Sequence, residues 1–151
     1  MKSSVEATVE APAAAVFDLI SDIDRLPEWN ANMTEVVERP SGELAAGAEW
    51  VVEFRAMGQS WRSRSRLEEL DHERRVFTYR SGTDDGNPSY ALWRWQVEGN
   101  GTGSDVTVQW DLHPATFWRK VLLGPVRHRQ LRRSEVPASI AALEAALARA
   151  G

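Results

Sequence analysis

The chain has 151 residues, a formal net charge of −4 and no cysteine. This length predicts one domain over residues 1–151 that buries roughly 70% of the surface that its unfolded form exposes. The composition excludes disulfide bonds, thiol nucleophiles and thiolate metal sites, and its acidic balance argues against a nucleic-acid partner. The sequence has no apolar stretch near the ~20 residues that span a bilayer and begins without the apolar run of a secretory signal. We therefore expect a cytoplasmic protein with no integral membrane segment.

The first 38 residues predict a strand, two short helices and a second strand. Residues 3–11 alternate between polar and apolar side chains, which is typical of a strand. Pro12 fits the first turn of a helix. The apolar residues that follow it at helical spacing are Val16, Leu19, Ile20 and Ile23. Pro27 then interrupts the pattern, so we predict a second brief helical turn before a strand near residues 33–38.

From Ala48 to His113 the pattern changes to short alternating runs that are separated by turn residues. Such runs predict strands, and their short connections predict an antiparallel meander. Together with the strand near residues 33–38, the meander has about six strands. The runs span residues 49–57, 60–70, 74–81, 90–98 and 105–113. The stretch "GNGTGS" before the last run resembles a phosphate loop but opens no helix, so we interpret it as a hairpin loop.

After Pro114 the apolar spacing becomes helical again. The apolar residues with this spacing are Phe117, Val121, Leu122, Val136, Ile140, Leu143 and Leu147. They predict a long C-terminal helix. A strongly twisted sheet must cover its apolar face, and this helix is the one predicted element that is long enough to do so.

Alternation along the five runs assigns one face of each strand to the interior. This inward set consists of Trp50, Val52, Phe54, Trp61, Ser63, Ser65, Leu67, Phe77, Tyr79, Trp93, Trp95, Val97, Val106, Val108, Trp110 and Leu112. On the opposite face, Arg62, Arg64 and Arg66 form a comb that we expect to face solvent. A bulge that shifted the register by one residue would instead turn the comb inward.

The order of these elements resembles the START-like, Bet v 1-type helix-grip superfamily (SRPBCC), in its polyketide cyclase/dehydrase-like branch of small bacterial proteins. The resemblance runs from Ser3 to about Ala148. Its most specific residues are Ala11-Pro12, Val16-Phe17, Asp22 and Pro27-x-Trp29. It implies an α+β fold: a curved antiparallel sheet of six to seven strands wrapped around a long C-terminal helix, with two short helices after the first strand. Gly124-Pro125 and Pro137 depart from the usual single helix, so we expect kinks or a break there.

The resemblance also implies a deep cavity between the sheet and the last helix, in which family members hold lipids, sterols, quinones, polyketides or other apolar molecules. We expect its walls to contain Trp50, Phe54, Trp61, Ser63, Ser65, Phe77, Tyr79, Trp93, Trp95, Trp110 and Phe117. The alternative is that these aromatic rings pack as a solid core. Ser63 and Ser65 favour the cavity, because two hydroxyls in a dry core need hydrogen-bond partners that cavity water or a ligand provides.

The sequence therefore favours a protein that binds a hydrophobic small molecule of the lipid, quinone, isoprenoid or polyketide class. One alternative is a polyketide aromatase/cyclase, for which Tyr79, Ser63, Ser65 and, in the shifted register only, Arg66 are candidates, although no motif identifies a catalytic residue. A second is an interaction module that uses the basic segment over residues 119–133. We expect no cofactor and no metal, because the three histidines lack the spacing of metal ligands.

Overall fold

The computed structural model describes residues 2–56, 58–84, 88–114 and 129–150. The helical elements are α1 (Ala13–Ile20), the 3₁₀ turn η1 (Ile23–Arg25), α2 (Leu26–Trp29), the π-helical turn η3 (Leu131–Glu135) and α4 (Val136–Ala150). The strands are β1 (Lys2–Val9), β2 (Met33–Glu38), β3 (Glu49–Ala56), β4 (Gln59–Asp71), β5 (Val76–Thr83), β6 (Tyr90–Gly99) and β7 (Ser104–His113). Among the described helices, none is long and apolar enough to cross a membrane.

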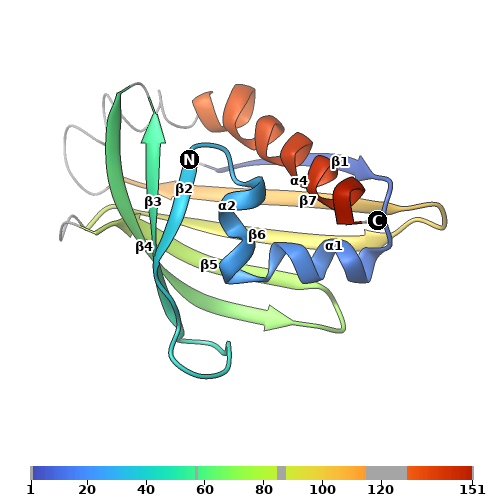
Figure 1. Cartoon of the computed structure of the whole chain (residues 1–151), viewed down its shortest axis with the longest axis horizontal. Coiled ribbons are helices and arrows are strands. Elements are labelled where there is room, and N and C mark those ends of the chain that lie inside the picture. The colour runs from blue at the N-terminus through green and yellow to red at the C-terminus, as the bar shows by residue number, and fades with distance from the viewer. Residues whose placement is uncertain (1, 57, 85–87, 115–128, 151) are drawn as a thin grey trace.

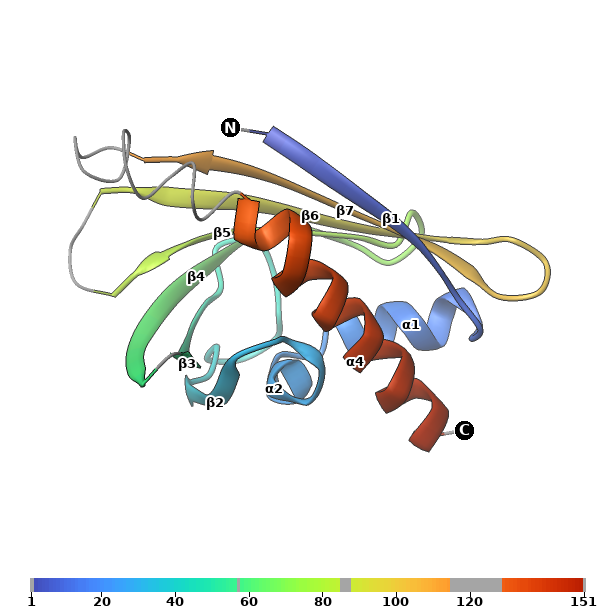
Figure 2. The same ribbon diagram turned by 90° about the horizontal axis from the view of Figure 1, so that it is seen from above.

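All seven strands form one antiparallel sheet in the order β1-β7-β6-β5-β4-β3-β2. The sheet is strongly curved (Figure 1), and α1, α2 and α4 all lie on its concave side (Figure 2). The predicted meander is confirmed, since β2 to β7 are each paired with their neighbours in sequence. This is the helix-grip arrangement that the sequence led us to expect.

The N-terminal helices close one end of the concave face. Helix α1 buries Val16, Phe17 and Ile20 and packs against β6 and β7. The apolar helical spacing runs on to Ile23, but the helix itself ends at Ile20. There the Ser21 hydroxyl donates to the carbonyl of Phe17 (2.8 Å), and the Asp22 carboxylate accepts the backbone N–H of Asp24 (3.2 Å) to start η1. Side chains that bond nearby backbone groups in this way compete with helix continuation.

The outer face of the sheet carries the arginine comb, as the alternation predicted. Arg62 and Arg66 are exposed, and Arg64 pairs with Glu38 (2.9 Å) and Asp84 (3.0 Å). Residues Glu38, Val51 and Arg64 occupy one row across β2, β3 and β4. The ion pair therefore spans the middle strand and covers Val51, which is buried although it lies on the outer face.

The last helix passes Pro137 without a break. The π-helical turn η3 ends at Glu135, and Pro137 is the second residue of α4. Proline has no N–H to donate, and its ring clashes with the carbonyl four residues earlier in a regular helix. A wider π turn at this point relieves that clash, so the expected irregularity takes the form of a local widening. Gly124-Pro125 lies outside the described residues.

Candidate ligand-binding cavity

A cavity of about 650 Å³ lies between the concave face of the sheet and the beginning of the last helix. Strands β3 to β6 form its floor, while α2, η3 and the first turn of α4 provide side chains opposite them. Its volume falls within the range of roughly 300–1,000 Å³ that holds drug-sized ligands. The interior is therefore not filled completely by the aromatic side chains.

Most of the expected wall residues line this cavity. These are Trp50, Phe54, Trp61, Ser63, Ser65, Tyr79, Trp93 and Trp95. Phe77 and Trp110 are buried behind the wall instead, where Phe77 stacks on Trp50 (ring centroids 6.1 Å apart) and Trp110 packs against Trp93 (5.8 Å). Phe117 lies outside the described residues. The geometry brings the eight lining residues together, and their role in binding a ligand stays a prediction.

The aromatic rings of the wall support one another. The Tyr79 ring contacts both Trp50 (5.6 Å) and Trp93 (6.5 Å), and Phe54 stacks on Trp61 (5.6 Å, 10° between planes). These separations lie in the range where aromatic pairs contribute about 0.5–1.5 kcal/mol beyond the area that they bury. The rings thus form a preorganised apolar surface that a planar ligand can contact.

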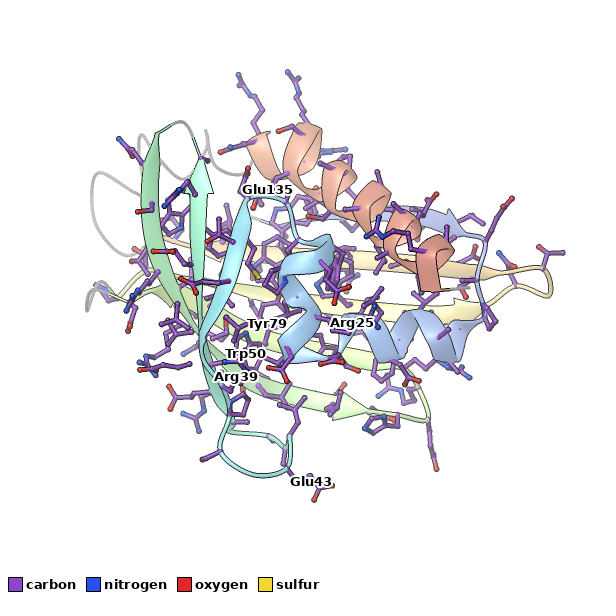
Figure 3. All side chains as sticks on the ribbon, in the orientation of Figure 1. Arg25, Arg39, Glu43, Trp50, Tyr79 and Glu135 are labelled. Atoms are coloured by element: carbon purple, nitrogen blue, oxygen red, sulfur yellow. The ribbon has the colours of Figure 1, made fainter. Side chains whose placement is uncertain are left out.

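The Tyr79 hydroxyl lies in an environment that keeps it protonated. Its burial raises the pKa of Tyr79 well above the usual value, and the nearby Glu135 carboxylate raises it further. The indole N–H of Trp95 lies close enough to oppose this shift but completes no hydrogen bond of ordinary geometry. The Tyr79 residue is half-buried and lines the cavity. Figure 3 shows Tyr79 near the middle of the sheet and Glu135 at the beginning of the last helix.

The helical side of the cavity depends on η3 and on the first turn of α4. Leu131, Glu135 and Ser139 line the cavity from these elements. The Ser139 hydroxyl also accepts the backbone N–H of Ala31 (2.9 Å), which ties α4 to the segment after α2. A π turn next to a cavity is common at functional sites, since it changes which side chains a helix turns inward.

Hydroxyl-bearing residues line the part of the floor that continues beyond the aromatic rings. Ser65 is paired with Ser81, and Ser63 with Thr83, across β4 and β5. Sequence reasoning missed Ser81 and Thr83, because the predicted strand ended at residue 81 and its inward set ended at Tyr79. Continued alternation to residues 81 and 83 was the signal that would have identified them.

At one edge of the cavity, Tyr90 and His113 stack with centroids 4.5 Å apart. Arg80 lies over the Tyr90 ring at 3.8 Å, and His113 Nε2 lies 2.9 Å from a carboxylate oxygen of Asp111. Sequence analysis assigned no ligand-binding role to this group, because alternation places its members on the outward face. The described residues contain no cluster of three or more potential metal ligands.

Charged side chains lie mostly outside the cavity. Arg66, a cyclase candidate only in a shifted register, is exposed on the outer face. Among the described lining residues none is lysine or arginine, and Glu135 provides a carboxylate. Arg129, Arg132 and Arg133 of the basic segment are exposed near the start of the last helix, and its remaining basic residues lie outside the described part.

Solved structures with the same fold include proteins of different kinds. The protein TTHA0849 from Thermus thermophilus is 18% identical with a TM-score of 0.78, and the match covers 100% of this chain and 99% of that one. Ara h 8.0201 is 15% identical, with a TM-score of 0.76 and 98% of both chains covered. The Zhui aromatase/cyclase from Streptomyces sp. R1128 is 18% identical, with a TM-score of 0.70 and 97% and 90% covered. The TM-scores show that the fold is shared.

Among curated protein sequences no match is found. Residues 1–148, by contrast, match the family described as polyketide cyclase / dehydrase and lipid transport. That span includes every described strand and all of α4 except its last two residues. The chain belongs to the polyketide cyclase / dehydrase and lipid transport family.

Proposed function

We propose that the protein binds a hydrophobic small molecule of the lipid, quinone, isoprenoid or polyketide class in the aromatic-lined cavity. The observation that carries this proposal is a volume of about 650 Å³ whose floor contains Trp50, Tyr79, Trp93 and Trp95. Transfer of an apolar ligand from water to such a surface contributes roughly 25 cal/mol per Å² of apolar area buried. The preassembled rings reduce the cost of ordering the site when the ligand binds.

Tryptophan fluorescence titration with a panel of lipids, quinones and polyketides tests this proposal. We expect saturable binding of at least one class, and Trp93→Ala should weaken it about tenfold because a large wall surface is lost. Arg62→Ala, on the outer face of β4, is the matched control and should bind as the wild type does. The absence of saturable binding across the whole panel would contradict the proposal.

A second candidate function is that of a polyketide aromatase/cyclase. It is supported by the presence of the protonated Tyr79 hydroxyl and the Glu135 carboxylate in one cavity. A carboxylate can take a proton from a polyketide methylene while a phenol donates to the carbonyl that the resulting carbon attacks. If this is correct, adding the protein to a minimal polyketide synthase changes the product profile, and Tyr79→Phe removes the change. An unchanged profile with the wild-type protein excludes this candidate.

A further inference from the structure

We propose that the cavity selects ligands that carry a neutral carbonyl or hydroxyl oxygen on a ring system, and that the hydroxyls of Ser63, Ser65 and Ser81 recognise that oxygen. This inference rests on the proposed binding function and specifies the chemistry and orientation of the ligand. In this orientation, the ring system of the ligand lies on the aromatic part of the cavity floor. The ligand oxygen points toward the serine hydroxyls on β4 and β5.

The strand register divides the floor of the cavity into two parts. The aromatic row across β4 to β7 consists of Leu67, Tyr79, Trp93 and Trp110. The next inward row across β3 to β7 consists of Trp50, Ser65, Ser81, Ala91 and Leu112. The following row contains Val52, Ser63 and Thr83. Small hydroxyl-bearing side chains thus form a polar patch, with Trp50 beside it and the aromatic row next to it.

Two of these serines line the cavity and are largely buried as residues. Ser63 is 8% exposed and Ser65 is 3% exposed, and the described residues provide no hydrogen bond to either side chain. Two other buried serines differ, since Ser104 donates to the carbonyl of Ala11 (2.6 Å) and Ser139 accepts from Ala31. Neither the Ser63 nor the Ser65 oxygen is among the fully buried polar atoms without a partner, which in the described residues are Trp29 Nε1 and Trp95 Nε1, so both oxygens are open to the cavity, where water or a ligand can bond them. Because Ser63 and Ser65 both line the cavity, a bound molecule can provide the missing partner.

The chemistry of the patch favours a neutral oxygen over a carboxylate. A serine hydroxyl both donates and accepts hydrogen bonds and carries no charge. The described lining residues provide no cationic lysine or arginine side chain to pair with an anion, whereas Glu135 contributes a carboxylate on the helical side. A phenol, a quinone or a polycyclic ketone matches this combination of an apolar ring and an uncharged oxygen.

Matched probes separate recognition of the oxygen from recognition of the ring. 2-Methyl-1,4-naphthoquinone and 2-methylnaphthalene share one carbon skeleton, and 2-naphthoic acid adds a charged oxygen group. The chain has no cysteine, so the quinone cannot form a thiol adduct and its binding is measured without covalent chemistry. Dissociation constants are measured by calorimetry for the wild type, for the Ser63→Ala/Ser65→Ala double variant and for Ser4→Ala, an exposed serine outside the cavity.

We expect the double variant to weaken quinone binding about tenfold while hydrocarbon binding stays the same or tightens. Ser4→Ala should match the wild type with every probe, and thermal melting should confirm that both variants are folded. An equal effect of the double variant on quinone and hydrocarbon would overturn the inference but leave the proposed function intact. Tighter binding of 2-naphthoic acid than of the quinone would overturn the preference for a neutral oxygen. If no naphthalene probe binds the wild type while another class of the fluorescence panel does, the inference fails and the proposed function stands.

Discussion

Two buried serines in opposite environments provide a test of how the cavity affects stability. The Ser65 hydroxyl lines the cavity without a protein partner in the described residues, whereas the Ser139 hydroxyl accepts the N–H of Ala31 at 2.9 Å. Ser65→Ala removes a hydroxyl that is open to the cavity and has no protein partner in the described residues, so the free energy of unfolding should change by less than about 1 kcal/mol. Ser139→Ala leaves the N–H of Ala31 without this partner and should lower the free energy of unfolding by about 1–3 kcal/mol.

Urea denaturation of both variants and the wild type, without added ligand, measures these differences. For a chain of 151 residues, each kcal/mol corresponds to a change in melting temperature of about 2–4 °C, so thermal scans provide a second readout. The two serines are similarly buried, at 3% and 5% exposure, and undergo the same chemical change. Equal destabilisation by both substitutions would refute the reasoning, since it would mean that the Ser65 hydroxyl has a stabilising partner.

Three further predictions concern stability. Burial raises the pKa of Tyr79 above that of an unfolded tyrosine, about 10, so stability should be full below pH 10 and decrease above it. Tyr79→Phe should reduce this decrease, and identical pH profiles would contradict the placement of the hydroxyl. Gly82→Ala would place a Cβ 2.9 Å from the carbonyl oxygen of Ser89. We expect urea denaturation to show a free energy of unfolding about 1–3 kcal/mol lower. An unchanged free energy would show that the backbone at Gly82 and Ser89 moves apart easily. Arg64→Ala uncovers Val51 and should cost about 1 kcal/mol, less at high salt, whereas a salt-independent cost would exclude the ion pairs as its cause.

The fold was largely predictable because alternation and turn residues agree along most of the chain. The inward faces of β3 to β7 follow directly from side-chain periodicity, and β2 lies at residues 33–38 where a strand was expected. The helix end at Ile20 was not predictable from spacing, since Ile23 continues the apolar period. The local bonds of Ser21 and Asp22 determine that end, and they compete with a pattern that remains helical.

The cavity was predictable in its general position but not in its depth. Alternation identifies the face to which a side chain belongs, but it does not distinguish Trp93, which lines the cavity, from Trp110, which packs behind it. That distinction depends on sheet curvature and on the position of the last helix. The contribution of Glu135 was also missed, because this residue ends the π-helical turn η3, which helical spacing of apolar residues does not predict.

A native mass spectrum of the folded protein, after incubation with the mixed lipid, quinone and polyketide panel, tests most directly whether this cavity holds a guest molecule. We predict one bound small molecule per chain, and its loss in Ser65→Trp, where an indole would occupy the space between Trp50 and Ser81. Circular dichroism should show that this variant retains the sheet. A wild-type spectrum that shows no bound small molecule would contradict the account. Equal binding by the wild type and by Ser65→Trp would contradict it as well.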